Sequence, residues 1–360
     1  MQKVFLAPVA VALCLAATLA QAAGFRFIEM PADAAGPALN GAMWYPCAEP
    51  PGEVDLGKYT AAFKITVRGA TDCPISGDKL PVVVVSHGMS GDFTDHHDLA
   101  ETLADAGFIV AAVDHPGDSS FDTSRDGDLS VMVERPTDIT RLINFMLGAS
   151  PAASRIDPKR VGFFGFSAGG YTGLVLIGAN PDWAIPLCTV FRDPREPSSA
   201  ASVCEQILRN GFRVQPVAHD PRIKAAVIAD PCCLWVTSDS FASVTIPVQL
   251  WASERATHLR GMLMPSAESV AAVDAKLPAT HEYHVVPNST HFAFLFLCPP
   301  GLEGTVRSAC REGLISCPPD PEKSVREICT DAAGFDRAAF HKTFNAAVLA
   351  FFLKHLPGVR

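Results

Sequence analysis

The sequence predicts an α/β fold with a mostly parallel central sheet flanked by helices. Short runs of β-branched apolar residues recur along the chain, and amphipathic helical patterns lie between them. The composition agrees with a folded α/β domain, because the 360 residues are 48% hydrophobic and 19% charged. A chain of this length can bury one large core without stabilising metals or disulfides. We therefore expect a globular enzyme-like or binding domain and neither a disordered nor a fibrous chain.

The predicted strands are short apolar runs bounded by Pro, Gly or Asp. Residues 25–46 alternate loosely between apolar and polar positions, which predicts one or two leading antiparallel strands. Lys79–Ser86 is a continuous apolar run, typical of a strand that a parallel sheet buries on both faces. The later runs of this kind are Phe108–Asp114, Val161–Phe166, Ile223–Asp230, Ile246–Trp251 and the shorter His284–Pro287.

Helical patterns separate these strands and close the sheet. Asp98–Ala106 and Asp138–Leu147 each place apolar residues on one face, and Ala338–Leu356 predicts a terminal amphipathic helix. Two segments depart from the alternation. Residues 183–220 are longer than an ordinary connection, which predicts a small lid-like insertion, and residues 298–334 hold four Cys, which predicts a disulfide-pinned loop.

The first 22 residues have the pattern of a secretory signal peptide. Lys3 is their only charge, an apolar stretch runs to Leu19, and Ala20-Gln21-Ala22 forms an A-x-A cleavage site. We therefore expect residues 23–360 to form a single exported domain, periplasmic or secreted, with no membrane span after signal removal.

Cysteine usage is typical of disulfides rather than of metal ligation. Removal of residues 1–22 leaves ten cysteines, an even number, and the chain has neither a C-x-x-C nor an H-E-x-x-H motif. We predict no metal and no other cofactor. The expected pairs are Cys47 with Cys73, Cys188 with Cys204, Cys298 with Cys329, and Cys310 with Cys317. Cys232 and Cys233 would then form a vicinal pair or remain two thiols.

The charge argues against a nucleic-acid partner. The formal net charge is −9, and no run of Lys or Arg could neutralise a phosphate backbone. A small molecule or a lipid is the expected partner. The sequence favours no particular oligomeric state.

Gly165-Phe166-Ser167-Ala168-Gly169 is a G-x-S-x-G motif in the context that its chemistry requires. It directly follows the strand Val161–Phe166 and opens a segment, Gly170–Gly178, that can be helical. The glycines allow a sharp turn from strand to helix, so that the serine hydroxyl projects at the carboxyl end of the sheet. Ser167 is therefore the candidate nucleophile.

A serine needs a base to become nucleophilic at neutral pH, and His291 is the candidate. It follows the last predicted strand within Asn288-Ser289-Thr290-His291-Phe292. The order along the chain, Ser before acid before His, is that of α/β-hydrolases.

The sequence resembles secreted α/β-hydrolases of the dienelactone-hydrolase-like and platelet-activating-factor-acetylhydrolase-like group from about Met43 onward. The matching segments are Ser86-His87-Gly88-Met89, Asp114-His115-Pro116-Gly117, Gly165–Gly169, His291-Phe292 and the stretch from Cys329. The resemblance implies an α/β-hydrolase fold and a carboxylic ester hydrolase. Dienelactone hydrolases carry a Cys where this chain has Ser167, which argues against dienelactone as the substrate.

Two residues are candidates for the acid that orients His291. Many α/β-hydrolases place it in a G-x-x-D pattern, and here Ala256 stands at the position of the Asp. Glu254 lies in that stretch, and Asp230 ends the strand before it. Asp230 is preferred, because the acetylhydrolases that the sequence resembles carry their acid one strand early.

Backbone donors for an oxyanion are expected from two loops. One is the N–H of Ala168, directly after the nucleophile, and the other is the N–H of Met89, in the loop after the strand Lys79–Ser86. His87, Trp183 and Trp235 are candidates for substrate binding, although aromatic residues of this kind also occur in ordinary cores.

The sequence thus predicts an exported serine esterase that cleaves short-acyl or lipid-type esters through an acyl-enzyme. Two alternatives remain: a lipase or amide hydrolase that uses the same triad, and a non-catalytic binding protein that retains the fold. The Ala at position 256 favours the last alternative, and the intact motif around Ser167 argues against it.

Overall fold

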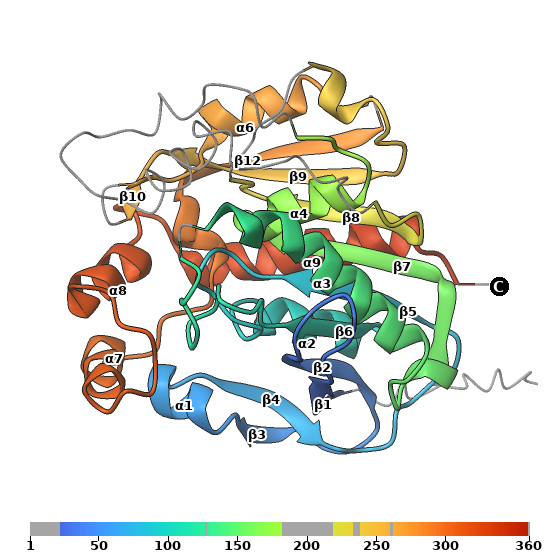
Figure 1. Cartoon of the computed structure of the whole chain (residues 1–360), viewed down its shortest axis with the longest axis horizontal. Helices are drawn as coiled ribbons and strands as arrows, with labels where there is room; N and C mark the ends of the chain where they lie inside the picture. The colour runs from blue at the N-terminus through green and yellow to red at the C-terminus, as the bar shows by residue number, and fades with distance from the viewer. Residues whose placement is uncertain are drawn as a thin grey trace, which may run out of the picture.

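The structure, a computed structural model, describes residues 22–126, 128–181, 219–232, 238–259, 262–278 and 280–358. It confirms the α/β class, with a central sheet flanked by helices (Figure 1). The strands are β1 (Ala22–Met30), β2 (Leu39–Cys47), β3 (Gly52–Asp55), β4 (Thr66–Thr71), β5 (Leu80–Ser86), β6 (Ile109–Val113), β7 (Ile156–Phe166), β8 (Ile223–Ala229), β9 (Val248–Arg255), β10 (His258–Leu259), β11 (Met262–Leu263) and β12 (His281–Thr290). The α-helices are α1 (Lys58–Phe63), α2 (His97–Asp105), α3 (Leu129–Leu147), α4 (Ala168–Leu176), α6 (Ala267–Asp274), α7 (Leu302–Arg311), α8 (Pro321–Cys329) and α9 (Arg337–His355).

Ten of the described strands form one sheet in the order β12-β9-β8-β7-β5-β6-β2-β1-β4-β3. The run from β12 to β6 is parallel throughout, whereas β2 pairs antiparallel with both β6 and β1. The predicted leading antiparallel strands are thus confirmed. Because the parallel strands all end at the same edge, the loops that follow β5, β7, β8 and β12 meet there.

Alternate residues of the central strands enter two separate cores. In β5, Val82 and Val84 pack with α3, α4 and α6 on one face of the sheet. Val83 and Val85 pack with α2 and α9 on the other face. A strand covered on both faces has no polar side, which explains the continuous apolar runs in the sequence.

Three features differ from the expected elements. Helix α3 begins at Leu129, because Asp128 caps it by accepting the N–H of Ser130, and it accommodates Pro136 in its interior. The Cys-rich stretch 298–334 is not a loop, since it contains the helices α7 and α8. The segment 48–72 adds β3, α1 and β4 to the edge of the sheet, and no pattern in the sequence predicted them.

Three predicted disulfides are confirmed: Cys47–Cys73, Cys298–Cys329 and Cys310–Cys317. Cys232 is disulfide-bonded as well, which excludes the free-thiol alternative for this residue. The predicted Cys188–Cys204 pair, the signal peptide up to residue 21 and the lid up to residue 218 lie outside the described residues.

In the part of the chain that the structure describes, no helix combines the length and the apolar character needed to cross a membrane.

The Cys47–Cys73 disulfide closes a loop of 26 residues that contains β3, α1 and β4. Chain entropy predicts that the Cys47→Ala/Cys73→Ala variant loses about 3 kcal/mol of unfolding free energy. Urea denaturation measures this loss. The matched control is Cys310→Ala/Cys317→Ala, which opens a loop of only 7 residues and should lose less. An equal or greater loss in the control would contradict the entropic account.

Candidate active site

Ser167 lies on the turn between β7 and α4 in a conformation that residues with a side chain rarely adopt. Its φ is 54° and its ψ is −116°. The N–H of Ser167 donates to the carbonyl of Ala229 at 3.0 Å, and the N–H groups of Tyr171 and Cys232 both donate to the Ser167 carbonyl at 3.1 Å. These bonds hold the turn, and Ser167 is 7% exposed. The sequence motif predicted this sharp turn.

The structure brings His291 and Asp230 to Ser167. Nε2 of His291 lies 3.0 Å from Oγ of Ser167, and Nδ1 of His291 lies 2.7 Å from Oδ2 of Asp230. His291 begins the short 3₁₀ turn η4 (His291–Phe294) directly after β12, and Asp230 directly follows β8. Both residues are buried, and the ring of Phe166 packs 4.6 Å from that of His291. The three side chains form one continuous hydrogen-bonded chain.

Ser253 holds the carboxylate of Asp230 from β9, and sequence reasoning missed it. Its N–H donates to Oδ1 at 3.0 Å and its hydroxyl donates to Oδ2 at 2.7 Å. The signal was present, since Ser253 lies in the stretch that carries the acid in many α/β-hydrolases. Glu254, the other candidate acid, is exposed and accepts the N–H of Asn288 at 2.7 Å. The structure therefore joins Asp230, and not Glu254, to His291.

The loop that follows β5 lies against the turn at Ser167. A Cβ at Gly169 would meet the main-chain carbonyls of Ser86 and His87, and one at Gly88 would lie 3.4 Å from Cβ of Ser167. Gly169 therefore needs to be glycine, because its backbone packs directly against the end of β5, and Gly88 lies in contact with the side chains of Phe166 and Ser167. Met89 follows Gly88 directly, and Ala168 is the first residue of α4. The two residues predicted to donate N–H groups therefore lie on the loops that meet at Ser167.

His87 does not present its ring to a substrate, contrary to the sequence prediction. It is 1% exposed, its Nε2 accepts the N–H of His115 at 3.1 Å, and its Nδ1 lies 2.6 Å from the carbonyl of Gly88. Burial, together with the charge of Arg135, holds the pKa of His87 well below its usual range. Both nitrogens of this neutral ring thus hold the loop in place. Trp183 and Trp235 lie outside the described residues.

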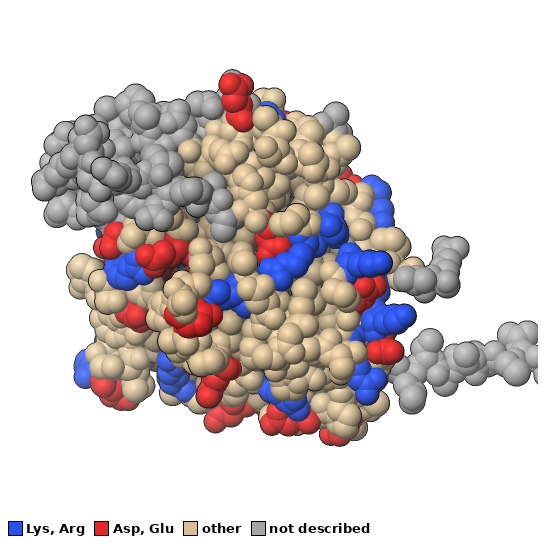
Figure 2. Space-filling model, turned by 45° about the vertical axis from the view of Figure 1, so that its right-hand side comes forward, with Lys and Arg blue, Asp and Glu red and all other residues tan. Residues whose placement is uncertain are grey.

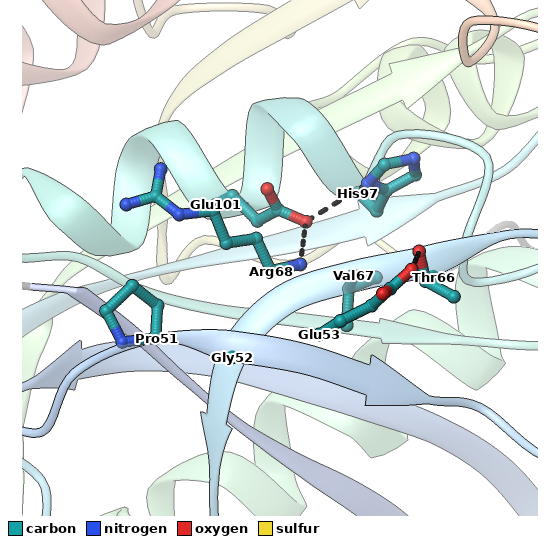
Figure 3. Close-up of a pocket in the computed structure, with 8 residues that line it drawn as sticks. All are labelled: Pro51, Gly52, Glu53, Thr66, Val67, Arg68, His97 and Glu101. Atoms are coloured by element: carbon teal, nitrogen blue, oxygen red, sulfur yellow. Dashed lines mark hydrogen bonds and ion pairs between the residues drawn. The ribbon is translucent and has the colours of Figure 1, made fainter.

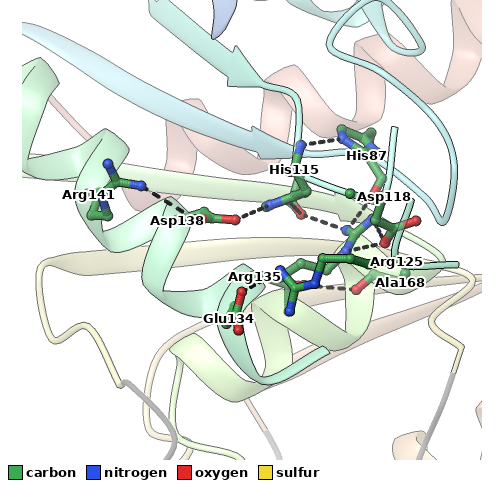
Figure 4. Close-up of polar contacts among 12 residues, drawn as sticks. His87, His115, Asp118, Arg125, Glu134, Arg135, Asp138, Arg141 and Ala168 are labelled. Atoms are coloured by element: carbon green, nitrogen blue, oxygen red, sulfur yellow. Dashed lines mark hydrogen bonds and ion pairs between the residues drawn. The ribbon is translucent and has the colours of Figure 1, made fainter. Parts of the chain in front are cut away.

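A second Ser–His–Asp chain starts from Ser86, the last residue of β5, and its His115 and Asp138 are shown in Figure 4. Oγ of Ser86 is 2.9 Å from Nε2 of His115, and Nδ1 of His115 is 3.0 Å from Oδ2 of Asp138. Burial raises the pKa of Asp138 to about 7 and lowers that of His115 well below its usual range. Ser86 is fully buried, so this chain supports the loop and is closed to a substrate.

Asp114 anchors the far part of the same loop. Its Oδ1 accepts the N–H of Phe93 at 2.9 Å, and its Oδ2 accepts the hydroxyl of Tyr59 at 2.6 Å. Burial, reinforced by the neighbouring charge of Asp92, raises the pKa of Asp114 to about 7. The folded protein therefore retains a proton there that the unfolded chain has already released.

A cavity of about 400 Å³ lies elsewhere, at the β3 edge of the sheet (Figure 3). Residues of β3, β4 and α2 line it, and none of the lining residues belongs to the chain Ser167–His291–Asp230. Within the described ranges, no group of three or more His, Cys, Asp or Glu is placed to hold a metal ion.

The raised pKa of Asp114 predicts a pH-dependent effect of Asp114→Asn. Between pH 4 and pH 7 the Asp114 carboxyl binds more protons in the folded state than in the unfolded state, so its contribution to the unfolding free energy falls as pH rises. The variant lacks this proton, so its stability relative to wild type should rise over that range by up to about 4 kcal/mol. Urea denaturation at pH 4, 5.5, 7 and 8 measures the difference. Asp78→Asn, at an exposed position, is the control and should give a constant difference; a constant difference for Asp114→Asn as well would refute the assignment.

The comparisons with known proteins agree with this architecture. A solved ferulic acid esterase from Streptomyces cinnamoneus superposes with a TM-score of 0.58 and 18% sequence identity, over 96% of this chain and 92% of that chain. At this identity the likeness shows a shared fold. No curated protein sequence matches the chain.

The family comparison identifies the chain more closely. The family model described as "Serine aminopeptidase, S33" matches residues 77–273, which is more than half of the chain. This range begins just before β5 and contains Ser167, Asp230 and Ser253. The chain therefore belongs to the serine aminopeptidase S33 family of hydrolases, with the α/β-hydrolase fold.

Proposed function

We propose that the protein is a carboxylic ester hydrolase that acts through the triad Ser167, His291 and Asp230. The observation that carries this proposal is the position of His291, which bridges the serine hydroxyl at 3.0 Å and the carboxylate at 2.7 Å. A nucleophile within hydrogen-bond reach of a base, itself oriented by a third group, is the arrangement that acyl transfer requires. No metal or organic cofactor enters this mechanism.

In the proposed cycle, Oγ of Ser167 attacks the ester carbonyl while Nε2 of His291 takes the hydroxyl proton. The N–H groups of Met89 and Ala168 stabilise the resulting oxyanion. His291 then gives its proton to the leaving alcohol, and the acyl group remains on Ser167. A water molecule, deprotonated by His291, hydrolyses this ester and releases the acid. Asp230 holds Nδ1 of His291 protonated and stabilises the cation that forms in both halves.

We assign a short-acyl specificity, as in the acetylhydrolase-like group that the sequence resembles. The position of Asp230 supports this subgroup, since it follows the strand next to that of the nucleophile in the sheet order. The lid-like segment 183–220 is interrupted by charged residues, whereas a lipase lid is a long apolar surface. Basic and acidic side chains are interspersed on the face shown in Figure 2, so that face offers no area of a single sign to steer a charged substrate.

Export is the second part of the proposal. The signal-like sequence of residues 1–22 supports it, as do the disulfides Cys47–Cys73, Cys298–Cys329 and Cys310–Cys317. Disulfides of this number persist in an oxidising compartment.

Turnover of nitrophenyl esters from acetate to palmitate tests the substrate class. We expect the rate to fall with acyl length, and Ser167→Ala to reduce kcat/KM at least about 10,000-fold while the protein stays folded, because no other group replaces the nucleophile. Loss of fluorophosphonate labelling in the variant is the accompanying control.

Each alternative function gives a different result in the same assay. A maximum at long acyl chains indicates a lipase, faster hydrolysis of leucine nitroanilide than of any ester indicates an aminopeptidase, and a preference for methyl ferulate indicates an aromatic-ester hydrolase. Activity that survives in Ser167→Ala rejects the nucleophile. Absence of both turnover and labelling in the wild type favours the non-catalytic binding protein.

Asp230→Asn and Glu254→Gln form a matched pair that tests the acid. An amide at position 230 donates a hydrogen bond toward Nδ1, which favours the tautomer whose Nε2 cannot accept the serine proton. We expect Asp230→Asn to lower kcat/KM roughly 1,000 to 10,000-fold. Glu254→Gln keeps an acceptor for Asn288 on the surface and should stay close to wild type. The reverse ranking would make Glu254 the acid.

A further inference from the structure

Arg135 is a buried arginine that forms hydrogen bonds to the loop after β5, which is proposed to supply an oxyanion donor. It lies on α3 and is 1% exposed. Its Nη1 donates to the carbonyl of His87 at 2.8 Å (Figure 4). Its Nη2 donates to the carbonyl of Gly88 at 2.9 Å. Its Nε donates to Asp118 at 2.9 Å. The planar fork of the guanidinium suits three acceptors in fixed directions, which the single ammonium of a lysine does not match.

The Gly88 carbonyl belongs to the same peptide unit as the N–H of Met89. Besides Arg135, this carbonyl receives Nδ1 of His87 at 2.6 Å and the N–H of Gly91 at 3.3 Å. None of the described peptide bonds is cis. In a trans peptide the carbonyl and the N–H point in opposite directions, so the Met89 N–H points away from Arg135. Gly88 itself lies against Ser167.

Donors on the carbonyl also strengthen the N–H at the other end of a peptide. Hydrogen bonds in a chain polarise one another, and the effect is larger in a buried site and with a charged donor. The guanidinium therefore acts on the Met89 N–H in two ways: it fixes the plane of the peptide, and it increases the positive partial charge on the hydrogen.

We propose that Arg135 is the positioning residue of the oxyanion hole, which aligns and polarises the Met89 N–H through the carbonyls of His87 and Gly88. The proposal rests on the ester-hydrolase function proposed above. Arg135 does not touch the substrate. Its effect on the rate arises as negative charge develops on the carbonyl oxygen of the substrate. Arg135 therefore lowers the free energy of the transition state more than that of the ground state.

Asp118 allows the charge of Arg135 to be buried. It is 3% exposed, and its Oδ1 accepts the N–H of Ser90 at 2.8 Å, so it fixes the loop after Met89 as well as the arginine. Truncation of Arg135 alone leaves this carboxylate buried and unpaired, at a cost in stability. The double variant Arg135→Met/Asp118→Asn removes both charges and retains an acceptor for Ser90.

The test compares Arg135→Lys and Arg135→Met/Asp118→Asn with wild type and with Arg160→Met. Arg160 is the matched control, because it also donates to main-chain carbonyls, those of Lys79 and Leu356. Lys79 directly precedes β5, so these contacts lie toward the amino ends of the strands, away from Ser167. The readouts are kcat and KM for nitrophenyl acetate and the inhibition constant of an alkyl trifluoromethyl ketone. Such a ketone forms a tetrahedral oxyanion with an active serine. Thermal unfolding confirms that each variant is folded.

We expect the double variant to lose about 10 to 100-fold in kcat with little change in KM, somewhat less than the loss of a whole oxyanion donor. Affinity for the ketone should fall by the same factor. Arg135→Lys should lie between it and wild type, and Arg160→Met should change neither quantity even if it unfolds earlier.

Two outcomes overturn the inference while the proposed function stands. One is wild-type kcat and ketone affinity in the folded double variant, and the other is a loss that resides in KM alone. If the wild type itself shows no Ser167-dependent hydrolysis, the proposed function fails instead, and the two failures are thereby distinguished.

Discussion

The turn at Ser167 is the constraint on which the rest of the site depends. A φ of 54° at a residue with a side chain costs on the order of 1–3 kcal/mol, and the surrounding structure must supply that energy. It does so through the hydrogen bonds that Ser167 makes to Ala229, Tyr171 and Cys232, and through the close packing of Gly169 against β5. The carboxyl ends of three neighbouring parallel strands, β5, β7 and β8, thus contact the turn at Ser167.

This convergence explains why a group of buried polar residues lies around the loops at this edge of the sheet. Asp230 is held by Ser253, and the loop after β5 is held by Asp114, Asp118 and Arg135. A buried polar group is tolerated only when its hydrogen bonds are made, and each of these bonds also fixes the position of a loop. The polar network therefore serves to place the backbone around Ser167, at the cost of burying charge.

The two Ser–His–Asp chains show how the environment separates structure from reactivity. Both have a histidine between a serine and an aspartate at distances of 2.7–3.0 Å. Ser86 is fully buried in β5 below the loop, whereas Ser167 stands on the turn at the carboxyl edge with 7% exposure. Residue types alone do not distinguish the two; position relative to the end of the strand does.

The sequence by itself determined the class of fold, the core strands and the turn at Ser167, because these leave local signals: apolar runs and a glycine-bounded motif. The cysteine positions predicted three pairs that the structure confirmed, although cysteine positions alone do not fix the pairing. Only the tertiary structure decided between Asp230 and Glu254, placed Ser253 on the carboxylate, turned His87 inward and revealed the contacts of Arg135. These choices depend on contacts between residues far apart in the chain, and a side chain's partner across a sheet edge has no periodicity that a sequence could show.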